Sequence, residues 1–215
     1  EINHIINENV EIEHQEGEGL VESRRFDISQ IDFDLLAAEF AKVKRKNLMI
    51  KDLNDLVQER LSKMMAVNPS RVDYYVRYMG IIETYNAEQD RTTIEKTFME
   101  LMDLAKSMSE EEQRYAREGF SSDEELSIYD LLFSENLSKS DIDKIKKMSK
   151  DLLQKIKERI AGMDHWTDKQ ETRAAVDVLI RNVLYEEIPD SMFDRLEAYR
   201  KAIYEHIYTH YKQAA

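Results

Sequence analysis

Two apolar stripes with helical spacing dominate residues 68–106, and they restrict the fold more than any other feature of the chain. The first stripe repeats at steps of three or four residues and consists of Val72, Tyr75, Tyr78 or Met79, Ile82 and Tyr85. The second has the same spacing and consists of Ile94, Phe98, Leu101, Met102 and Ala105. Such spacing places each set on one face of a helix. We therefore expect two helices, the first opened by Pro69 and Ser70, that bury these faces against each other.

Similar stripes fill most of the remaining chain, which has only five glycines and two prolines. The longest runs through Ile142, Ile145, Met148, Leu152, Ile156 and Ile160. Serines followed three residues later by an acid predict helix starts at Ser29, Ser109, Ser122 and Ser140, and Gly119 and Gly162 stand where helices should end. The sequence thus predicts an all-α protein of about eight or nine amphipathic helices in one or two packed bundles.

Charge is distributed unevenly along the chain. The formal net charge is −13, and residues 1–23 contribute seven acids with no lysine or arginine, which leaves −6 for the other 192 residues. We expect residues 1–24 to form an extended acidic connector or edge strand, followed by a helical subdomain over 25–119 and a C-terminal one over 120–215. Because the chain also begins without methionine, we expect it to be a piece of a longer protein.

Composition excludes several classes of protein. A surface this acidic is not that of a generic DNA-binding protein, although local basic faces remain possible. The chain has no cysteine, and hence no disulfide or thiolate site. It also lacks an apolar run near the roughly 18 residues that a membrane span needs, and it lacks an export leader. We therefore expect a cytoplasmic protein with no membrane contact.

Catalytic motifs for nucleotide or phosphodiester chemistry are missing. The glycines are too scattered to form a phosphate-binding loop that ends in Gly-Lys-Ser/Thr. No lysine follows an acid at the two-residue spacing that PD-(D/E)xK nucleases use, so Pro189-Asp190 predicts a helix start. We expect neither catalytic residues nor a bound cofactor in this chain.

Histidines offer only weak metal-binding patterns. Glu1 with His4, and Glu11 with His14, have the Glu-x-x-His spacing of di-iron bundles, but they lie in the acidic, poorly periodic end. His206 and His210 lie four residues apart, without the glutamate that zinc proteases place after the first histidine. We predict no metal site, and hydrogen-bonded or solvated side chains for this pair.

Two further features are candidates for interaction with other molecules. Trp166, the single tryptophan, fits either a lock between packed helices or an anchor in an interface pocket. The basic segment 42–46 and the basic helix 144–157 could contact phosphate, although such faces are often simply solvated. The residues that we single out for phosphate or partner contact are Lys144, Lys146, Lys147, Lys150 and Arg159.

The order of several short segments carries more information than any one of them. These are Asn-Pro-x-Arg at Asn68–Arg71, Tyr78 with Ile81-Ile82, Tyr85-Asn86, Ile94-Glu95 leading to Leu101, Glu118-Gly119 before Leu126–Leu132, Asp164–Thr167, Arg173-Ala174, Ile188-Pro189 and Tyr204–Tyr208. In this order the chain, from about Phe26 to Tyr211, resembles the C-terminal helical region of the restriction (R, or HsdR-type) subunit of type I restriction-modification enzymes.

The resemblance implies a non-catalytic role. In that family the nuclease domain and two ATP-driven motor domains lie upstream, so ATP and Mg²⁺ would belong to those domains. The helical region would pack on the subunit's own motor domains and help to dock them on the methyltransferase subunits, and DNA would be met by the whole complex.

Three functions follow from these observations. The first is an assembly and scaffold module of an ATP-dependent restriction enzyme, or a helical protein-interaction domain more generally. The second is a nucleic-acid contact module in which the basic helix follows backbone phosphate. The third is a free-standing helical enzyme with a buried carboxylate or histidine site, which only the composition supports.

Overall fold

The computed structural model describes residues 31–88 and 90–212, in which helices are joined by short connections and no strand occurs. The all-α prediction is therefore confirmed. The predicted acidic connector 1–24, the cap at Ser29 and both Glu-x-x-His pairs lie outside the described residues. No helix in the described ranges has the length and apolar character that crossing a bilayer requires.

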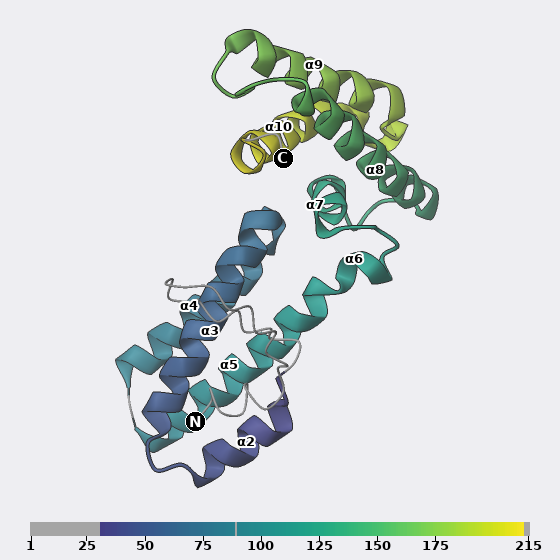
Figure 1. The fold of residues 1–215 in the computed structure, drawn as a ribbon. Helices are drawn as coiled ribbons and strands as arrows, with labels where there is room; N and C mark the ends of the chain where they lie inside the picture. The colour runs from purple at the N-terminus through teal and green to yellow at the C-terminus, as the bar shows by residue number, and fades with distance from the viewer. Residues whose placement is uncertain (1–30, 89, 213–215) are drawn as a thin grey trace, which may run out of the picture. The chain divides into compact units, whose positions relative to one another are not determined.

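Nine α-helices and two short 3-10 helices follow one another in the described chain (Figure 1). In order they are α2 (Phe33–Lys42), α3 (Lys46–Val67), η2 (Pro69–Arg71), α4 (Val72–Ala87), α5 (Arg91–Glu112), α6 (Arg114–Arg117), α7 (Asp123–Leu132), α8 (Lys139–Ala161), α9 (Gln170–Glu187), η3 (Asp190–Arg195) and α10 (Leu196–His210).

The chain forms two compact units. Unit 1 contains residues up to 64 together with 71–113, and unit 2 contains residues 65–70 together with 114–215. The sequence predicts a boundary after residue 119, whereas the units divide after residue 113. The reason is that α6 and the turn after it pack against α7, and Lys146 of α8 donates to Glu118 at 2.7 Å.

Unit 1 is built on α3, α4 and α5, with α2 packed against α5. Its centre contains Leu53 and Val57 of α3 and Leu101 of α5, all fully buried. Phe98 of α5 stacks on Phe40 of α2 with ring centroids 3.6 Å apart. Charged side chains join the same helices at their edges, because Lys46 of α3 donates to Glu95 of α5 at 2.7 Å.

The outward face of α4 contradicts the sequence prediction. Val72 and Tyr75 were expected in the core, but 47% and 45% of their surface is exposed, and Val76 is 64% exposed. Tyr78 is buried, as one of the two predicted alternatives, and Ile81 is buried where Ile82 was expected. Apolar residues lie on both sides of the charged residues Asp73 and Arg77 in the first three turns of α4, so their spacing could not single out the buried face.

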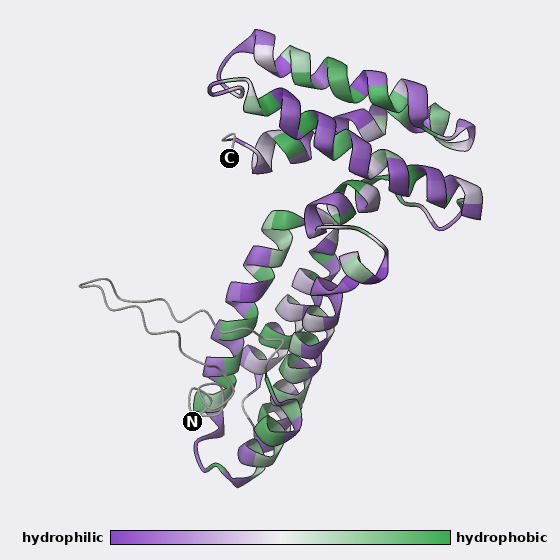
Figure 2. Ribbon diagram, turned by 45° about the vertical axis from the view of Figure 1, so that its right-hand side comes forward, coloured by the Kyte–Doolittle hydropathy of each residue, from purple (hydrophilic) through white to green (hydrophobic). Residues whose placement is uncertain are grey.

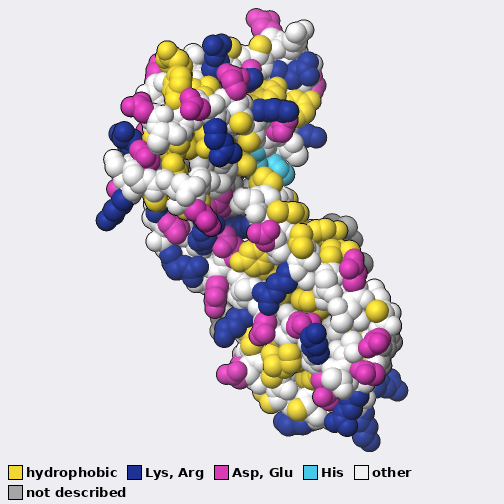
Figure 3. Space-filling model, turned by 180° about the vertical axis from the view of Figure 1, so that it is seen from behind, with side chains coloured by type: hydrophobic (Ala, Val, Ile, Leu, Met, Phe, Trp, Pro, Cys, Tyr) yellow, Lys and Arg dark blue, Asp and Glu magenta, His cyan; other side chains and the backbone are white. Residues whose placement is uncertain are grey.

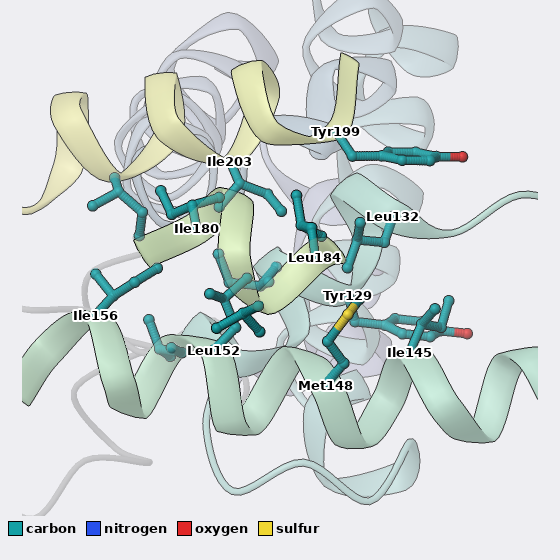
Figure 4. Close-up of a cluster of buried hydrophobic side chains, with 14 of the residues drawn as sticks. Tyr129, Leu132, Ile145, Met148, Leu152, Ile156, Ile180, Leu184, Tyr199 and Ile203 are labelled. Carbon is teal, nitrogen blue, oxygen red and sulfur yellow. The ribbon is translucent and has the colours of Figure 1, made fainter. Parts of the chain in front are cut away.

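Unit 2 packs α8 between α7 and α9, with α10 against both α7 and α9. Figure 4 shows side chains from all four helices meeting in one cluster, including Ile145 and Met148 of α8, Leu184 of α9 and Ile203 of α10. Green and purple alternate along α8 and α9 in Figure 2, as expected for helices with one apolar face. The predicted α8 stripe is thus confirmed from Ile145 to Ile160.

Helix ends follow capping chemistry only in part. Ser122 caps α7 by accepting from the Glu125 amide at 3.3 Å, as predicted. Ser109 caps nothing, because the apolar stripe continues to the fully buried Met108 and α5 runs on to Glu112. The α8 cap is Ser138 and not Ser140, since Ser138 accepts from the Asp141 amide at 3.1 Å.

Gly119 ends α6 with a φ of 81°, in the left-handed region that favours glycine. The amide of the next residue, Phe120, donates back to the Tyr115 carbonyl at 2.8 Å, which closes the helix end. The predicted C-terminal cap is therefore confirmed.

Two glycine replacements should have opposite effects on stability. A Cβ added at Gly119 or at Gly80 of α4 would meet no neighbouring atom within 4 Å, so the backbone conformation alone sets the change in stability. Gly119→Ala should lower the free energy of unfolding by about 1 kcal/mol because of its positive φ. Gly80→Ala should raise it by about 0.5–1 kcal/mol through helix propensity. Urea unfolding followed by circular dichroism measures both, and equal effects would contradict this account.

Candidate functional site

The basic helix α8 uses two of its predicted contact residues inside unit 2. Lys146 donates to the Glu118 carboxylate at 2.7 Å and to its carbonyl at 3.1 Å. Lys150 donates to the Gly119 carbonyl at 2.6 Å and lies 5.4 Å from the centre of the Phe120 ring. The hydrogen bond from Lys146 lowers the pKa of Glu118. These two ammonium groups thus cap the end of α6.

The other three predicted contact residues are not brought into one cluster with them. Lys144, Lys147 and Arg159 form no ion pair within the described parts of the chain. Arg159 borders a shallow hollow of about 360 Å³ beside Lys155, which pairs with Glu187 at 3.0 Å. Phosphate contact along α8 therefore stays a prediction, carried by fewer free cations than the sequence suggests.

Trp166 is fully buried in unit 2. Its Nε1 donates to the Tyr211 carbonyl at 2.6 Å, and its ring meets that of Tyr208 edge-on at 5.9 Å. The Trp166 carbonyl accepts from Thr172 at 2.6 Å. The side chain ties the connection between α8 and α9 to the end of α10, and it has no exposed ring surface in this structure for a partner's pocket.

A buried Ser127–His206 pair escaped the sequence reasoning. Ser127 Oγ lies 3.1 Å from His206 Nε2 and donates its proton to the Glu124 carbonyl at 2.7 Å. His206 Nε2 must therefore donate to the serine, which leaves Nδ1 without a partner among the described residues. The serine is not activated as a nucleophile, because its proton is directed at a backbone carbonyl. Burial lowers the pKa of His206 to about 4, with His210 adding to the shift.

Metal-binding clusters do not occur in the described ranges. No three histidine, aspartate or glutamate side chains come together there in a way that could hold an ion. His206 and His210 are ring neighbours, with centroids 4.8 Å apart, but His206 is sequestered by Ser127.

Asp130 of α7 is the centre of a buried polar cluster in unit 2. It accepts from both terminal nitrogens of Arg114, at 3.0 and 2.7 Å, and from Asn68 Nδ2 at 2.7 Å. Asn68 is fully buried, and its Oδ1 accepts from the Ser70 amide at 3.1 Å and the Ser70 hydroxyl at 2.8 Å. The cluster binds residues 65–70 to α6 and α7.

The Asn-Pro-x-Arg segment thus has a structural role. Arg71, three residues after Asn68, is buried in unit 1 and donates to Glu111 at 3.2 Å. Asn68 satisfies its polar groups in unit 2. Buried polar side chains need such specific partners, so their identities tolerate little change. That requirement explains how the segment can mark a family without being an active site.

This helical arrangement can be compared with known proteins. Residues 2–211 match the family described as "Type I restriction enzyme HindI endonuclease subunit-like, C-terminal". The chain belongs to this family. The resemblance to the C-terminal helical region of type I restriction enzyme R subunits is thereby confirmed.

A relative in Methanocaldococcus jannaschii is named as the MjaIXP endonuclease subunit of a type I restriction enzyme. This HindI-like C-terminal region is 27% identical to it over 183 residues, which cover 80% of the chain and 17% of that relative. No solved structure matches the chain.

Removing the Asp130 carboxylate should destabilise unit 2 strongly. Asp130→Ala removes the carboxylate to which Arg114 and the buried Asn68 both donate, and losing one member of a buried pair costs about 3 kcal/mol. The control is Asp177→Ala, which removes one of the two carboxylates that pair with Arg200, the other being Glu197, and should cost less than about 1 kcal/mol. Urea titrations of the two variants measure the difference, and an equal loss would contradict the role of Asp130.

Acidification should destabilise unit 2 through His206. Its pKa is 6.5 when exposed and about 4 in the folded chain, so the unfolded chain takes up the proton first as pH falls. The stability that neutral His206 contributes is therefore fully present above pH 6.5. It is lost as pH falls, and the free energy of unfolding should be about 3 kcal/mol lower near pH 4. Glu118 and Asp141 also have lowered pKa values, but the stability that they contribute is lost only at lower pH, below the ordinary pKa of 4.5 for Glu118 and 3.8 for Asp141.

Unfolding free energies between pH 7 and 4.5 test this assignment. His206→Gln keeps a donor for Ser127 and should remove most of the dependence, and the remainder should come from His210, whose pKa is also lowered by burial. If the unfolding free energy of the unmodified protein did not change over this pH range, the assignment to His206 would be wrong.

Proposed function

We propose that this region is a non-catalytic assembly module of the endonuclease subunit, which docks the motor domains onto the methyltransferase core. Membership of the HindI-like C-terminal family supports a place in a multi-subunit restriction enzyme. ATP and Mg²⁺ are then used by other domains of the parent subunit. The observation that carries the docking role is the apolar outer face of α4.

The outer face of α4 has the composition of an interface. Helical spacing places residues 72, 76, 79, 83 and 87 on one side, and only Glu83 among them is charged. Val72, Tyr75 and Val76 are each exposed over nearly half of their surface or more. A surface helix of a free-standing protein normally carries charged side chains on the side that faces water.

Val72, Tyr75 and Val76 lie within about one helical turn of each other, with the exposed Asp73 and Arg77 beside them, and such a group of exposed apolar side chains favours a protein partner. Burying it releases about 25 cal/mol for each Å² removed from water. Val76 and Val72 would be central to such a contact, and Tyr75 belongs to a residue type enriched at binding hot spots. The face therefore supports assembly rather than catalysis.

A charge on this face should weaken docking without unfolding the chain. Val76→Asp, introduced in the full-length endonuclease subunit, places a carboxylate at a 64% exposed position, where the folded chain tolerates it and an apolar partner does not. We expect at least a tenfold loss of affinity for the methyltransferase subunits or for an isolated motor fragment, measured by calorimetry.

The matched control is Val178→Asp on α9, a valine with 51% exposure outside this face. It should bind both partners as the unmodified subunit does. Unchanged binding of Val76→Asp to both partners would refute the assignment of this face, and failure of the unmodified subunit to bind either would refute docking.

A further inference from the structure

A second surface of unit 1, unrelated to the outer face of α4, is strongly basic. A hollow of about 610 Å³ is lined by five cations and by no carboxylate, with the half-exposed Leu48 beside them. The five cations, which we call the basic end, are Lys44, Arg45, Lys46, Lys51 and Arg91.

Three segments bring the basic end together. After α2 ends at Lys42, the chain is extended at Val43 and bends at Lys44 before α3 begins at Lys46. Lys51 lies one turn further along α3. Arg91 comes from the first turn of α5. Cations far apart in sequence thus surround one hollow.

Two of the five cations are held in place, and three are free. Glu95 pairs with Lys46 at 2.7 Å and with Arg91 at 3.1 Å, and Lys46 lies 4.8 Å from the centre of the Phe40 ring. Lys44, Arg45 and Lys51 are exposed and have no ion pair in the described part of the chain. Glu95 faces two of the five cations, and Glu39 and Asp52 line a neighbouring hollow with Lys44 and Arg45 without pairing with them, so a local excess of positive charge remains.

This excess stands out because the formal charge of the whole chain is −13. In Figure 3, Lys and Arg side chains gather at the lower end of the view, and Figure 1 draws the connection between α2 and α3 at its lower end too. Over unit 2, Lys and Arg alternate with Asp and Glu in Figure 3. An acidic chain repels a polyanion generally, so contact requires such a local exception.

We propose that the basic end binds the phosphate backbone of duplex nucleic acid without reading its sequence. An endonuclease subunit acts on nucleic acid, so family membership favours this polyanion over an acidic polypeptide. Phe40 beneath Lys46 is buried, so its ring is not available for base stacking. Contacts from lysine and arginine alone depend on phosphate density, which is highest in a duplex.

The test is the salt dependence of binding by the whole chain. Fluorescence anisotropy with a labelled duplex of about 20 random base pairs, between about 25 and 150 mM NaCl, gives a slope of log affinity against log salt. The triple variant K44A/R45A/K51A removes only exposed side chains. It should make that slope less steep by about 2–3, because each lost phosphate contact reduces its magnitude by about 0.9. Its affinity at the lowest salt should fall at least tenfold.

The matched control removes three cations from unit 2. The K144A/K147A/R159A variant changes the net charge by the same amount and should keep the slope and affinity of the unmodified chain. A reduced slope in this control alone would move the contact to α8 and overturn the proposal. Absence of salt-dependent binding by the unmodified chain would also overturn it.

Competition identifies the ligand. Unlabelled duplex should displace the probe, whereas poly-glutamate at the same charge concentration should not. Displacement by poly-glutamate as effective as by duplex would overturn the nucleic-acid assignment. These outcomes do not depend on the docking role, which is tested with variants of α4.

Discussion

The start of unit 2 depends on the hydrogen bonds that the Asp130 carboxylate accepts. A carboxylate buried without partners would be too costly to keep charged, so its environment has to supply donors. Arg114 supplies two and Asn68 one, and Asn68 in turn holds the Ser70 amide. Because these donors come from residues 68 and 114, the short stretch after α3 is counted with unit 2, although the helices on both sides of it form unit 1.

Regular amphipathic stripes made the fold class predictable. α8 has one apolar face with charges opposite, so its buried residues could be read from spacing alone. α4 could not be read in this way, because Tyr78 and Ile81 inside and Val72 and Val76 outside are equally apolar. Only packing partners decide between such faces, and those partners are distant in sequence. The Ser109 cap failed for a similar reason, since tertiary packing at Met108 overrode a local signal.

The candidate sites show the same limit for charged residues. The sequence suggests that Lys146 and Lys150 are free surface cations, but their ammonium groups donate hydrogen bonds to the carbonyl oxygens of Glu118 and Gly119. Lys44 and Arg45 belong to a run that looks no more basic than α8, and the fold leaves them exposed and without an ion pair in the described residues, although Glu39 and Asp52 line a neighbouring hollow with them. A lysine's availability depends on its neighbours in space, which a helical pattern does not record. The Asn68 and Arg71 markers were visible in the sequence, but their burial was not.

The placement of Asn68 has a consequence for how such regions can be exchanged between proteins. A gene fusion or recombination event that joins foreign sequence at residue 113 would keep every helix from α6 to α10. It would nevertheless separate Asp130 from the asparagine that it accepts from, 62 positions earlier. The two units are therefore not independently transferable cassettes, and the region is expected to be inherited as one block.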